Sequence, residues 1–280
     1  DLSEGDSIAT SATATVNATV KAAAGVTATD ANNKGTINVT VTDDVTAGQT
    51  VSFAAVNAAA DENGYTIDAS ANNNAILLLG TKSADTITSG TGNDTITGGA
   101  GADSLILGSG VDGVVATTGL TVDNITGFGS NDVFGISVGG LETAENVVTG
   151  LTMDLTDSDG TATDANTTAV VLAVAGATTL TKTATILSYT AAKVANAAAL
   201  ETALEVGGGV LTTEADTGLT KDDAFLIQYQ DSDTNGWNLA VINSTATVAK
   251  NVQIAAVEVT DLFTTDYTSA FVAANFDYVA

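Results

Sequence analysis

Four consecutive nine-residue units between Gly80 and Val115 constrain the fold more than any other feature of the chain. They read GTKSADTIT, SGTGNDTIT, GGAGADSLI and LGSGVDGVV, and they share the pattern G-G-x-G-x-D-x-U-x, in which U is apolar. A fixed short period of this kind is typical of a solenoid, in which each unit packs against its neighbours along one axis. The sixth positions are Asp85, Asp94, Asp103 and Asp112, and the eighth positions are Ile87, Ile96, Leu105 and Val114.

The order of residues within a unit predicts a tight turn followed by a short strand. The turn G-G-x-G-x-D needs backbone angles that glycine adopts readily, and the apolar residue of the strand points into a narrow core. Turn carbonyls and aspartate carboxylates are hard oxygen ligands that suit Ca²⁺, and this nonapeptide pattern is that of a calcium-binding β-roll. The candidate ligand residues are Asp85, Asp94, Asp103 and Asp112 with Gly90, Gly92, Gly99, Gly101, Gly108 and Gly110.

Two units make one full coil of the expected roll, so residues 18 apart stack on the same side. We expect Asp85 to lie over Asp103 and Asp94 over Asp112, with a cation between each pair. One small apolar residue per unit scarcely offsets roughly 1–2 kcal/mol of backbone entropy per residue, so folding and metal binding should be coupled. The alternative is a Gly/Asp-rich loop or a string of β-turns that binds no metal.

The two ends of the repeat region are less regular than its middle. Thr81 and Ser83 stand where the pattern has glycines, and the last unit begins with Leu107. We therefore expect two well-formed sites between turns, and one or two further sites at the edges stay open.

Charge narrows the partners that such a chain can have. The net charge is -26, from 33 acidic residues and seven basic ones, all of which are lysine. Binding to nucleic acid or to an anionic membrane surface needs clustered Lys and Arg, so neither partner is expected. Carboxylates in this excess repel one another unless cations screen or bind them, which favours multivalent metal ions. Solubility in a salty or extracellular medium explains the charge equally well.

The absent residue types exclude several kinds of chemistry. The chain has no Cys and no His, so it lacks a disulfide framework, imidazole-bound zinc and a Ser-His-Asp triad. No run of 18 apolar residues is present, so no membrane span is expected. We expect no enzyme activity, although 33 carboxylates leave chance pairs of the glycosidase type open.

The rest of the chain is predicted to be mostly β. Residues 1–78 hold segments that alternate apolar and polar residues, which favours a small N-terminal β-sandwich or sheet. One surface helix is expected at 190–206, capped by Thr190, and a hairpin is expected over 223–243. The predicted domains are therefore a β-strand-rich domain at 1–78, a β-roll at 79–116 and a β-rich C-terminal assembly and secretion domain at 117–280.

The nonapeptides resemble those of the RTX (repeats-in-toxin) proteins, which are calcium-binding bacterial proteins exported by type I secretion. VDNITGFGSNDVFGIS at 122–137 is similar to the segment that commonly follows an RTX roll, and the tail SAFVAANFDYVA resembles an uncleaved type I secretion signal. The acidic, Thr- and Ala-rich composition without Cys is most like RTX surface-layer proteins of Gram-negative bacteria. Because the first residue is Asp1 rather than Met, we also expect a processed form or a piece of a longer protein.

This resemblance implies a structural surface-layer protein at the bacterial cell surface. It would stay unfolded at low cytosolic calcium, fold outside the cell and assemble with copies of itself into a lattice; a cell-surface anchor stays open as a further partner. Two alternatives remain: the C-terminal module of an RTX adhesin, or the export domain of a secreted hydrolase whose catalytic part is absent.

Three other motifs have plain structural explanations. DSDTNG at 231–236 begins like an EF-hand loop, but its twelfth position would be Ile242, which cannot supply the bidentate carboxylate, so a hairpin turn is favoured. DSDGTATD at 157–164 reads as an acidic loop, with a surface calcium loop as the alternative. GDS at 5–7 lacks the histidine that a serine nucleophile needs.

Overall fold

The chain divides into two compact units, Asp1–Gly135 and Ile136–Ala280, and each is described by itself. The first unit contains both the predicted N-terminal domain at 1–78 and the predicted β-roll at 79–116. The domain bounds expected at residues 78 and 116 stay a prediction. The computed structural model describes residues 1, 14–21, 26–27, 35–53, 63–116, 121–137, 171–174, 178–179, 186–205, 211–212, 224–244 and 257–279.

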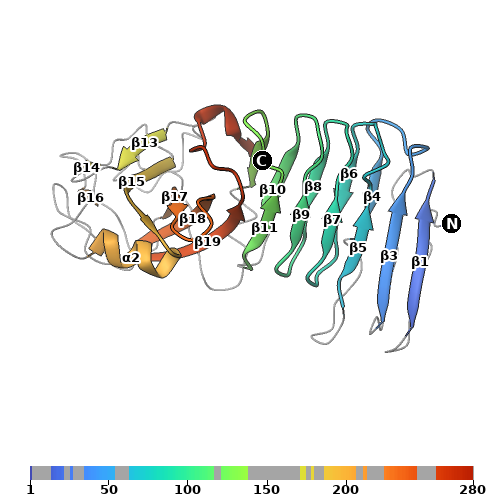
Figure 1. Ribbon diagram of the computed structural model, residues 1–280, viewed down its shortest axis with the longest axis horizontal. Helices are drawn as coiled ribbons and strands as arrows, with labels where there is room; N and C mark the ends of the chain where they lie inside the picture. The colour runs from blue at the N-terminus through green and yellow to red at the C-terminus, as the bar shows by residue number, and fades with distance from the viewer. Residues whose placement is uncertain are drawn as a thin grey trace, which may run out of the picture. The chain divides into compact units, whose positions relative to one another are not determined.

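The first unit is a parallel β-roll made of two sheets (Figure 1). Successive strands alternate between the sheets, so every second strand is a neighbour in the same sheet. The first sheet has the order β1 (Thr15–Val20), β3 (Thr36–Val41), β5 (Tyr65–Asp68), β7 (Thr86–Thr88), β9 (Ser104–Ile106) and β11 (Asp123–Thr126). The second has the order β2 (Val26–Thr27), β4 (Thr50–Ser52), β6 (Leu77–Leu79), β8 (Thr95–Thr97), β10 (Gly113–Ala116) and β12 (Val133–Ser137).

The register within the repeats confirms that two nonapeptides make one coil. Ile87 of β7 pairs with Leu105 of β9, and Ile96 of β8 pairs with Val114 of β10. All four side chains are at most 1% exposed, so the apolar eighth position of each unit does fill the core between the sheets. Within the repeats a slip of this pairing by one residue would turn the apolar side chains outward, so the buried eighth positions specify the register.

The N-terminal strands belong to the same roll instead of forming a separate sandwich. β3 pairs in parallel with β5, and β5 pairs in parallel with β7 of the first repeat. The alternation of apolar and polar residues, which suggests half-buried sandwich strands, fits a roll strand equally well because such a strand also buries one face. In the first sheet these strands are longer than those of the repeats: β1 and β3 have six residues each, whereas β7 and β9 have three.

The described residues of the second unit form a mixed sheet, a helix and several short elements. Its sheet has the order β13 (Val171–Val174), β15 (Ile186–Val194), β17 (Ala224–Asp231), β18 (Trp237–Ser244) and β19 (Val257–Thr265). β18 is antiparallel to both of its neighbours, β17 and β19. The other elements are the pair β14 (Thr178–Thr179) and β16 (Leu211–Thr212), helix α2 (Ala197–Glu205), the 3-10 helix η1 (Ala273–Asn275) and β20 (Phe276–Val279).

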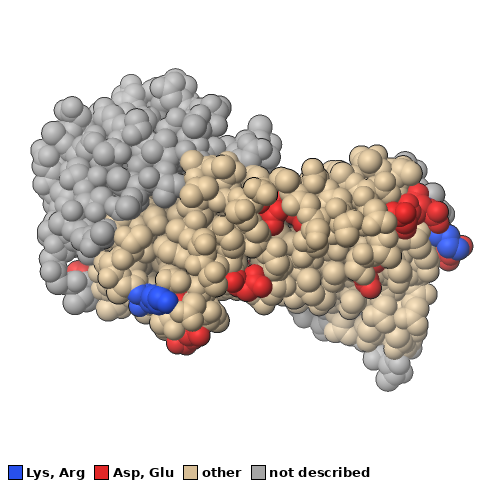
Figure 2. Space-filling model, turned by 45° about the horizontal axis from the view of Figure 1, so that its top comes forward, with Lys and Arg blue, Asp and Glu red and all other residues tan. Residues whose placement is uncertain are grey.

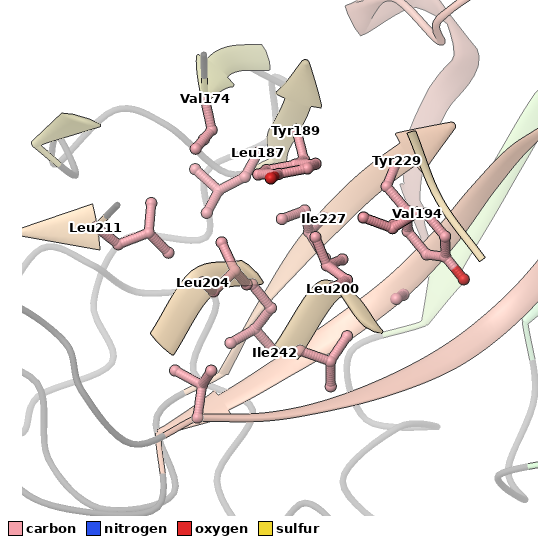
Figure 3. Packing of buried hydrophobic residues seen from close by; sticks show 13 residues of the cluster. Val174, Leu187, Tyr189, Val194, Leu200, Leu204, Leu211, Ile227, Tyr229 and Ile242 are labelled. Atoms are coloured by element: carbon pink, nitrogen blue, oxygen red, sulfur yellow. The ribbon is translucent and has the colours of Figure 1, made fainter. Parts of the chain in front are cut away.

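Helix α2 is shorter than the sequence predicts. Residues 190–194 continue strand β15, and the helix begins at Ala197, with Asn196 rather than Thr190 as its cap: the Asn196 Oδ1 accepts the Ala199 N–H at 2.9 Å. Asn is a preferred N-cap because its side-chain oxygen satisfies a free amide of the first turn. Leu200 and Leu204 enter a buried cluster with residues of the sheet (Figure 3).

The hairpin predicted over 223–243 is present as β17 and β18. The acidic sequence at 231–236 forms its turn, in which Asp231 Oδ1 accepts the N–H groups of Asp233 and Thr234 at 2.7 and 2.8 Å. Among the described residues, no helix has the length and apolar content needed to cross a membrane. Residues 157–164 and 5–7, whose motifs were considered above, lie outside the described part of the chain.

Candidate metal centre

The six-residue turns of the repeats form two stacks, one along each long side of the roll. Residues 80–85 and 98–103 form one stack, and residues 89–94 and 107–112 form the other. Close packing between successive turns explains the glycines. A Cβ on Gly99 would lie 1.9 Å from the Thr81 carbonyl oxygen, and one on Gly108 would lie 1.7 Å from the Gly90 carbonyl oxygen. The other glycines predicted at the site also face the backbone of the preceding turn: Gly90, Gly92, Gly101 and Gly110.

Each repeat aspartate reaches back by one coil to the backbone. The Asp85 N–H donates to Asp103 Oδ1 at 2.8 Å, and the Asp94 N–H donates to Asp112 Oδ1 at 2.9 Å. All four side chains are at most 2% exposed. The predicted stacking of aspartates 18 residues apart is therefore present, and the contact that creates it is a hydrogen bond from backbone to carboxylate.

Two more aspartates extend these ladders beyond the repeats. The Asp103 N–H donates to Asp123 Oδ1 at 3.0 Å, and the Asp112 N–H donates to Asp132 Oδ1 at 2.9 Å. Neither was a predicted site residue, because each stands 20 rather than 18 residues after its partner and so falls out of the nonapeptide period. The surviving signal is an apolar residue two positions after each aspartate, Ile125 and Phe134, both of which are buried.

The second carboxylate oxygen separates the first two repeats from the last two. Asp94 Oδ2 accepts the Gly90 N–H at 3.0 Å. Asp85 Oδ2 accepts the Thr81 N–H at 2.6 Å and the Thr81 hydroxyl at 3.1 Å, so threonine at a glycine position satisfies this carboxylate. Asp103 Oδ2 and Asp112 Oδ2 are buried and have no hydrogen-bond partner. An unpaired buried carboxylate oxygen is costly, and a cation is the ligand that would offset that cost.

Burial also changes the acidity of these groups. Burial, together with the negative charges of Asp123 and Asp85, raises the pKa of Asp103 to about 8. Burial raises the pKa of Asp112 to about 6, with added repulsion from Asp132 and Asp94. The same cause raises the pKa of Asp85 and of Asp123 to about 6 each, and that of Asp94 above its ordinary value. Stacked carboxylates without a counter-charge hold protons that a divalent cation would displace.

Carboxylates alone do not make a complete ligand set here. No group of three or more Asp, Glu, His or Cys side chains that could hold a metal ion occurs among the described residues. A cation would therefore need backbone carbonyls as well. The carbonyls of Gly90 and Gly92 face the turn at 107–112, and those of Thr81 and Ser83 face the turn at 98–103.

This donor set fits Ca²⁺ better than other common metal ions. Carbonyl and carboxylate oxygens are hard ligands, and Ca²⁺ accepts six to eight of them in flexible geometry. Zinc and copper prefer imidazole or thiolate ligands, and the chain has no His and no Cys. The residues that would hold an ion are Asp94 and Asp112 with the carbonyls of Gly90 and Gly92, and Asp85 and Asp103 with the carbonyls of Thr81 and Ser83.

Comparison with known proteins supports this assignment for one part of the chain. No curated protein sequence and no solved structure matches the chain. Residues 79–114, however, match the RTX calcium-binding nonapeptide repeat in four copies. These are the residues that carry the stacked turns, the buried aspartates and the close glycine contacts. The chain therefore carries four RTX calcium-binding repeats, and Ca²⁺ is the ion that such repeats bind.

Proposed function

We propose that this chain is a secreted structural protein whose β-roll folds when it binds calcium outside the cell. The observation that carries the proposal is the pair of buried oxygens without partners, Asp103 Oδ2 and Asp112 Oδ2, inside a matched calcium-repeat segment. In the cytosol, where calcium is scarce, these carboxylates would oppose folding. Millimolar external calcium matches extracellular calcium modules, whose Kd is about 10⁻⁴–10⁻³ M.

We further propose that folded copies assemble into a surface layer, and that the role of this chain is structural rather than catalytic. A net charge of -26 keeps copies apart unless cations bind or screen it. On the face drawn in Figure 2, separate groups of acidic side chains lie between broad uncharged areas of the described surface. Calcium would both fold the roll and lower the repulsion between neighbouring molecules, so one ion would control both steps.

A calcium titration tests the proposal in two stages. Far-UV circular dichroism of the full chain, with chelator added at the end, should show β structure that appears with calcium and disappears with chelator. Electron microscopy of the same samples should show ordered sheets in calcium and dispersed molecules in chelator. Magnesium at equal concentration is the control, because Mg²⁺ demands octahedral geometry and gives up its water reluctantly.

The outcomes separate the parts of the proposal. A spectrum that does not respond to calcium would overturn calcium-dependent folding. A spectrum that responds without any ordered assembly would leave the calcium-binding roll and remove the surface layer. Hydrolysis of a protein, lipid or glycan substrate by the folded chain would overturn the non-catalytic role.

A further inference from the structure

The turn that precedes the repeats is held together by side-chain amides. Residues 69–75, with the sequence ASANNNA, lie one coil before the turn at 89–94, because β5 pairs with β7 and β6 pairs with β8. Asn72 is completely buried. Its Nδ2 donates to the carbonyls of Thr42 at 2.6 Å and Val45 at 2.9 Å, both in the turn of the coil before.

A second asparagine repeats the arrangement. Asn74 Nδ2 donates to the Val45 carbonyl at 3.0 Å and to the Asp43 carbonyl at 3.2 Å. Three backbone carbonyls of one turn are thus satisfied by two amides of the next turn. In the repeats the facing positions are glycines, which have no side chain to donate, and the carbonyls of Gly90 and Gly92 face the following turn directly.

The aspartate ladders end where the amides begin. Their last contacts are the Tyr65 N–H to Asp85 Oδ1 at 2.6 Å and the Ile76 N–H to Asp94 Oδ1 at 3.0 Å, so Tyr65 and Ile76 stand at aspartate positions. Among the described residues from 14 to 79, no carboxylate is buried. These coils therefore lack the buried like charges that separate stacked turns in the repeats.

The same coils have a larger apolar core. β3 alone buries Ile37, Val39 and Val41, whereas each repeat strand buries one apolar residue. Phe53 and Tyr65 pack with their ring centroids 5.2 Å apart, and both are at most 1% exposed. Apolar burial is the main favourable term in folding, so these coils have a source of stability that needs no ion.

From these contacts we infer that the coils before Gly80 keep their fold without metal and serve as the template on which the calcium repeats fold. The inference rests on the calcium-dependent folding proposed above and specifies where it starts. β5 and β6 present a formed edge, and the first repeat adds to it through β7 and β8. Calcium would then extend an existing roll, which avoids the cost of forming a first coil in solution.

Hydrogen exchange of the full chain tests the inference. In excess chelator, peptides from 35–53 and 63–79 should stay protected while peptides from 80–116 and 121–135 exchange rapidly; calcium should then protect the second group. If both groups exchange rapidly in chelator and both are protected by calcium, the template is overturned while calcium-dependent folding stands. If neither group responds to calcium, calcium-dependent folding itself fails.

One isosteric substitution tests the amide contacts directly. Asn72→Asp keeps the oxygen that accepts the Asn74 N–H at 2.8 Å but replaces the two donated hydrogen bonds with a carboxylate oxygen facing carbonyls. In chelator it should accelerate exchange of 63–79 roughly tenfold to hundredfold. Asn38→Asp is the control: it makes the same change of charge, but its amide donates to Asn17 Oδ1 on the outer face. Unchanged protection in Asn72→Asp would overturn the inference.

Discussion

The Asp94 backbone N–H lies 2.9 Å from Oδ1 of Asp112, a residue one coil later in the roll. This contact uses one carboxylate oxygen to hold two turns together and leaves the other, Asp112 Oδ2, buried without a hydrogen-bond partner. The same side chain therefore has a structural oxygen and an oxygen available to a cation. In the proposed calcium site, stacking and ion binding would be linked through this single residue.

Removing the negative charge of this residue should weaken calcium binding. Asp112→Asn retains an oxygen that can accept the Asp94 N–H but cannot neutralise a divalent ion. We expect the calcium midpoint of folding to rise about tenfold or more, because lost charge-assisted contacts cost about 1.5–3 kcal/mol. Circular dichroism titration measures it. Asp233→Asn, at an exposed position in the hairpin turn, is the control, and equal midpoints in the two variants would contradict the assignment.

Because successive turns approach closely, replacing one glycine of the repeats by alanine should destabilise the protein much more than replacing another. Gly108→Ala would place a Cβ 1.7 Å from the Gly90 carbonyl oxygen, whereas the nearest atom to a Cβ on Gly113 is 3.7 Å away. We expect Gly108→Ala to lower the free energy of unfolding in saturating calcium by about 3 kcal/mol, the upper part of the range for overpacking. Gly113→Ala should change it by less than about 1 kcal/mol. Denaturant unfolding compares them, and similar losses would argue against tight stacking.

Low pH should partly substitute for calcium in stabilising the folded roll. The pKa is about 6 for Asp85 and Asp112 and about 8 for Asp103 in the fold, above the value near 3.9 of an unfolded chain. The metal-free roll therefore binds more protons than the unfolded chain, and protons stabilise it. This stabilisation is complete below about pH 4 and is lost as the pH rises through 6 to 8. Circular dichroism in chelator should show more β structure at low pH; an equal or smaller amount would contradict it.

The second unit should respond to core mutation without a change in calcium dependence. Leu204 is 2% exposed within the cluster that joins α2 to its sheet. Leu204→Ala should lower the free energy of unfolding of this unit by about 2–5 kcal/mol through the cavity it leaves. Thr202→Ala, on the exposed side of the helix, is the control. Thermal unfolding in calcium measures the loss, and a shift in the calcium midpoint would show that the two properties are coupled.

Strict periodicity made the repeats predictable from the sequence. Asp85 and Asp103 are related by the same spacing as Ile87 and Leu105, so the turn contacts and the core contacts specify one register. The N-terminal coils have no such period, because the segments between their strands differ in length. Their alternating pattern shows which side chains are buried but not which strands are neighbours, so a sandwich and a roll could not be told apart.

Some residues of the site could not be predicted from the sequence, for a different reason. Asp123 stands eleven rather than nine residues after Asp112, and this one addition places Asp123 and Asp132 each 20 residues after its partner while the stacking is preserved. Asn72 and Asn74 have no counterpart in the repeat pattern, and their role depends on carbonyls about 30 residues earlier. Helix α2 starts later than expected because strand β15 continues to Val194 and Asn196 caps the helix. The apolar periodicity of the sequence shows neither the end of the strand nor the cap.

The alternation of strands between two sheets gives the roll a parity rule. Inserting one nonapeptide after Thr97 would transfer every later roll strand to the opposite sheet and bring Asp103 and Asp112 into the wrong stacks. Inserting two nonapeptides would add one coil and leave every later strand in its own sheet. A roll of this kind can therefore lengthen or shorten only by even numbers of units. A duplication or deletion must add or remove whole coils.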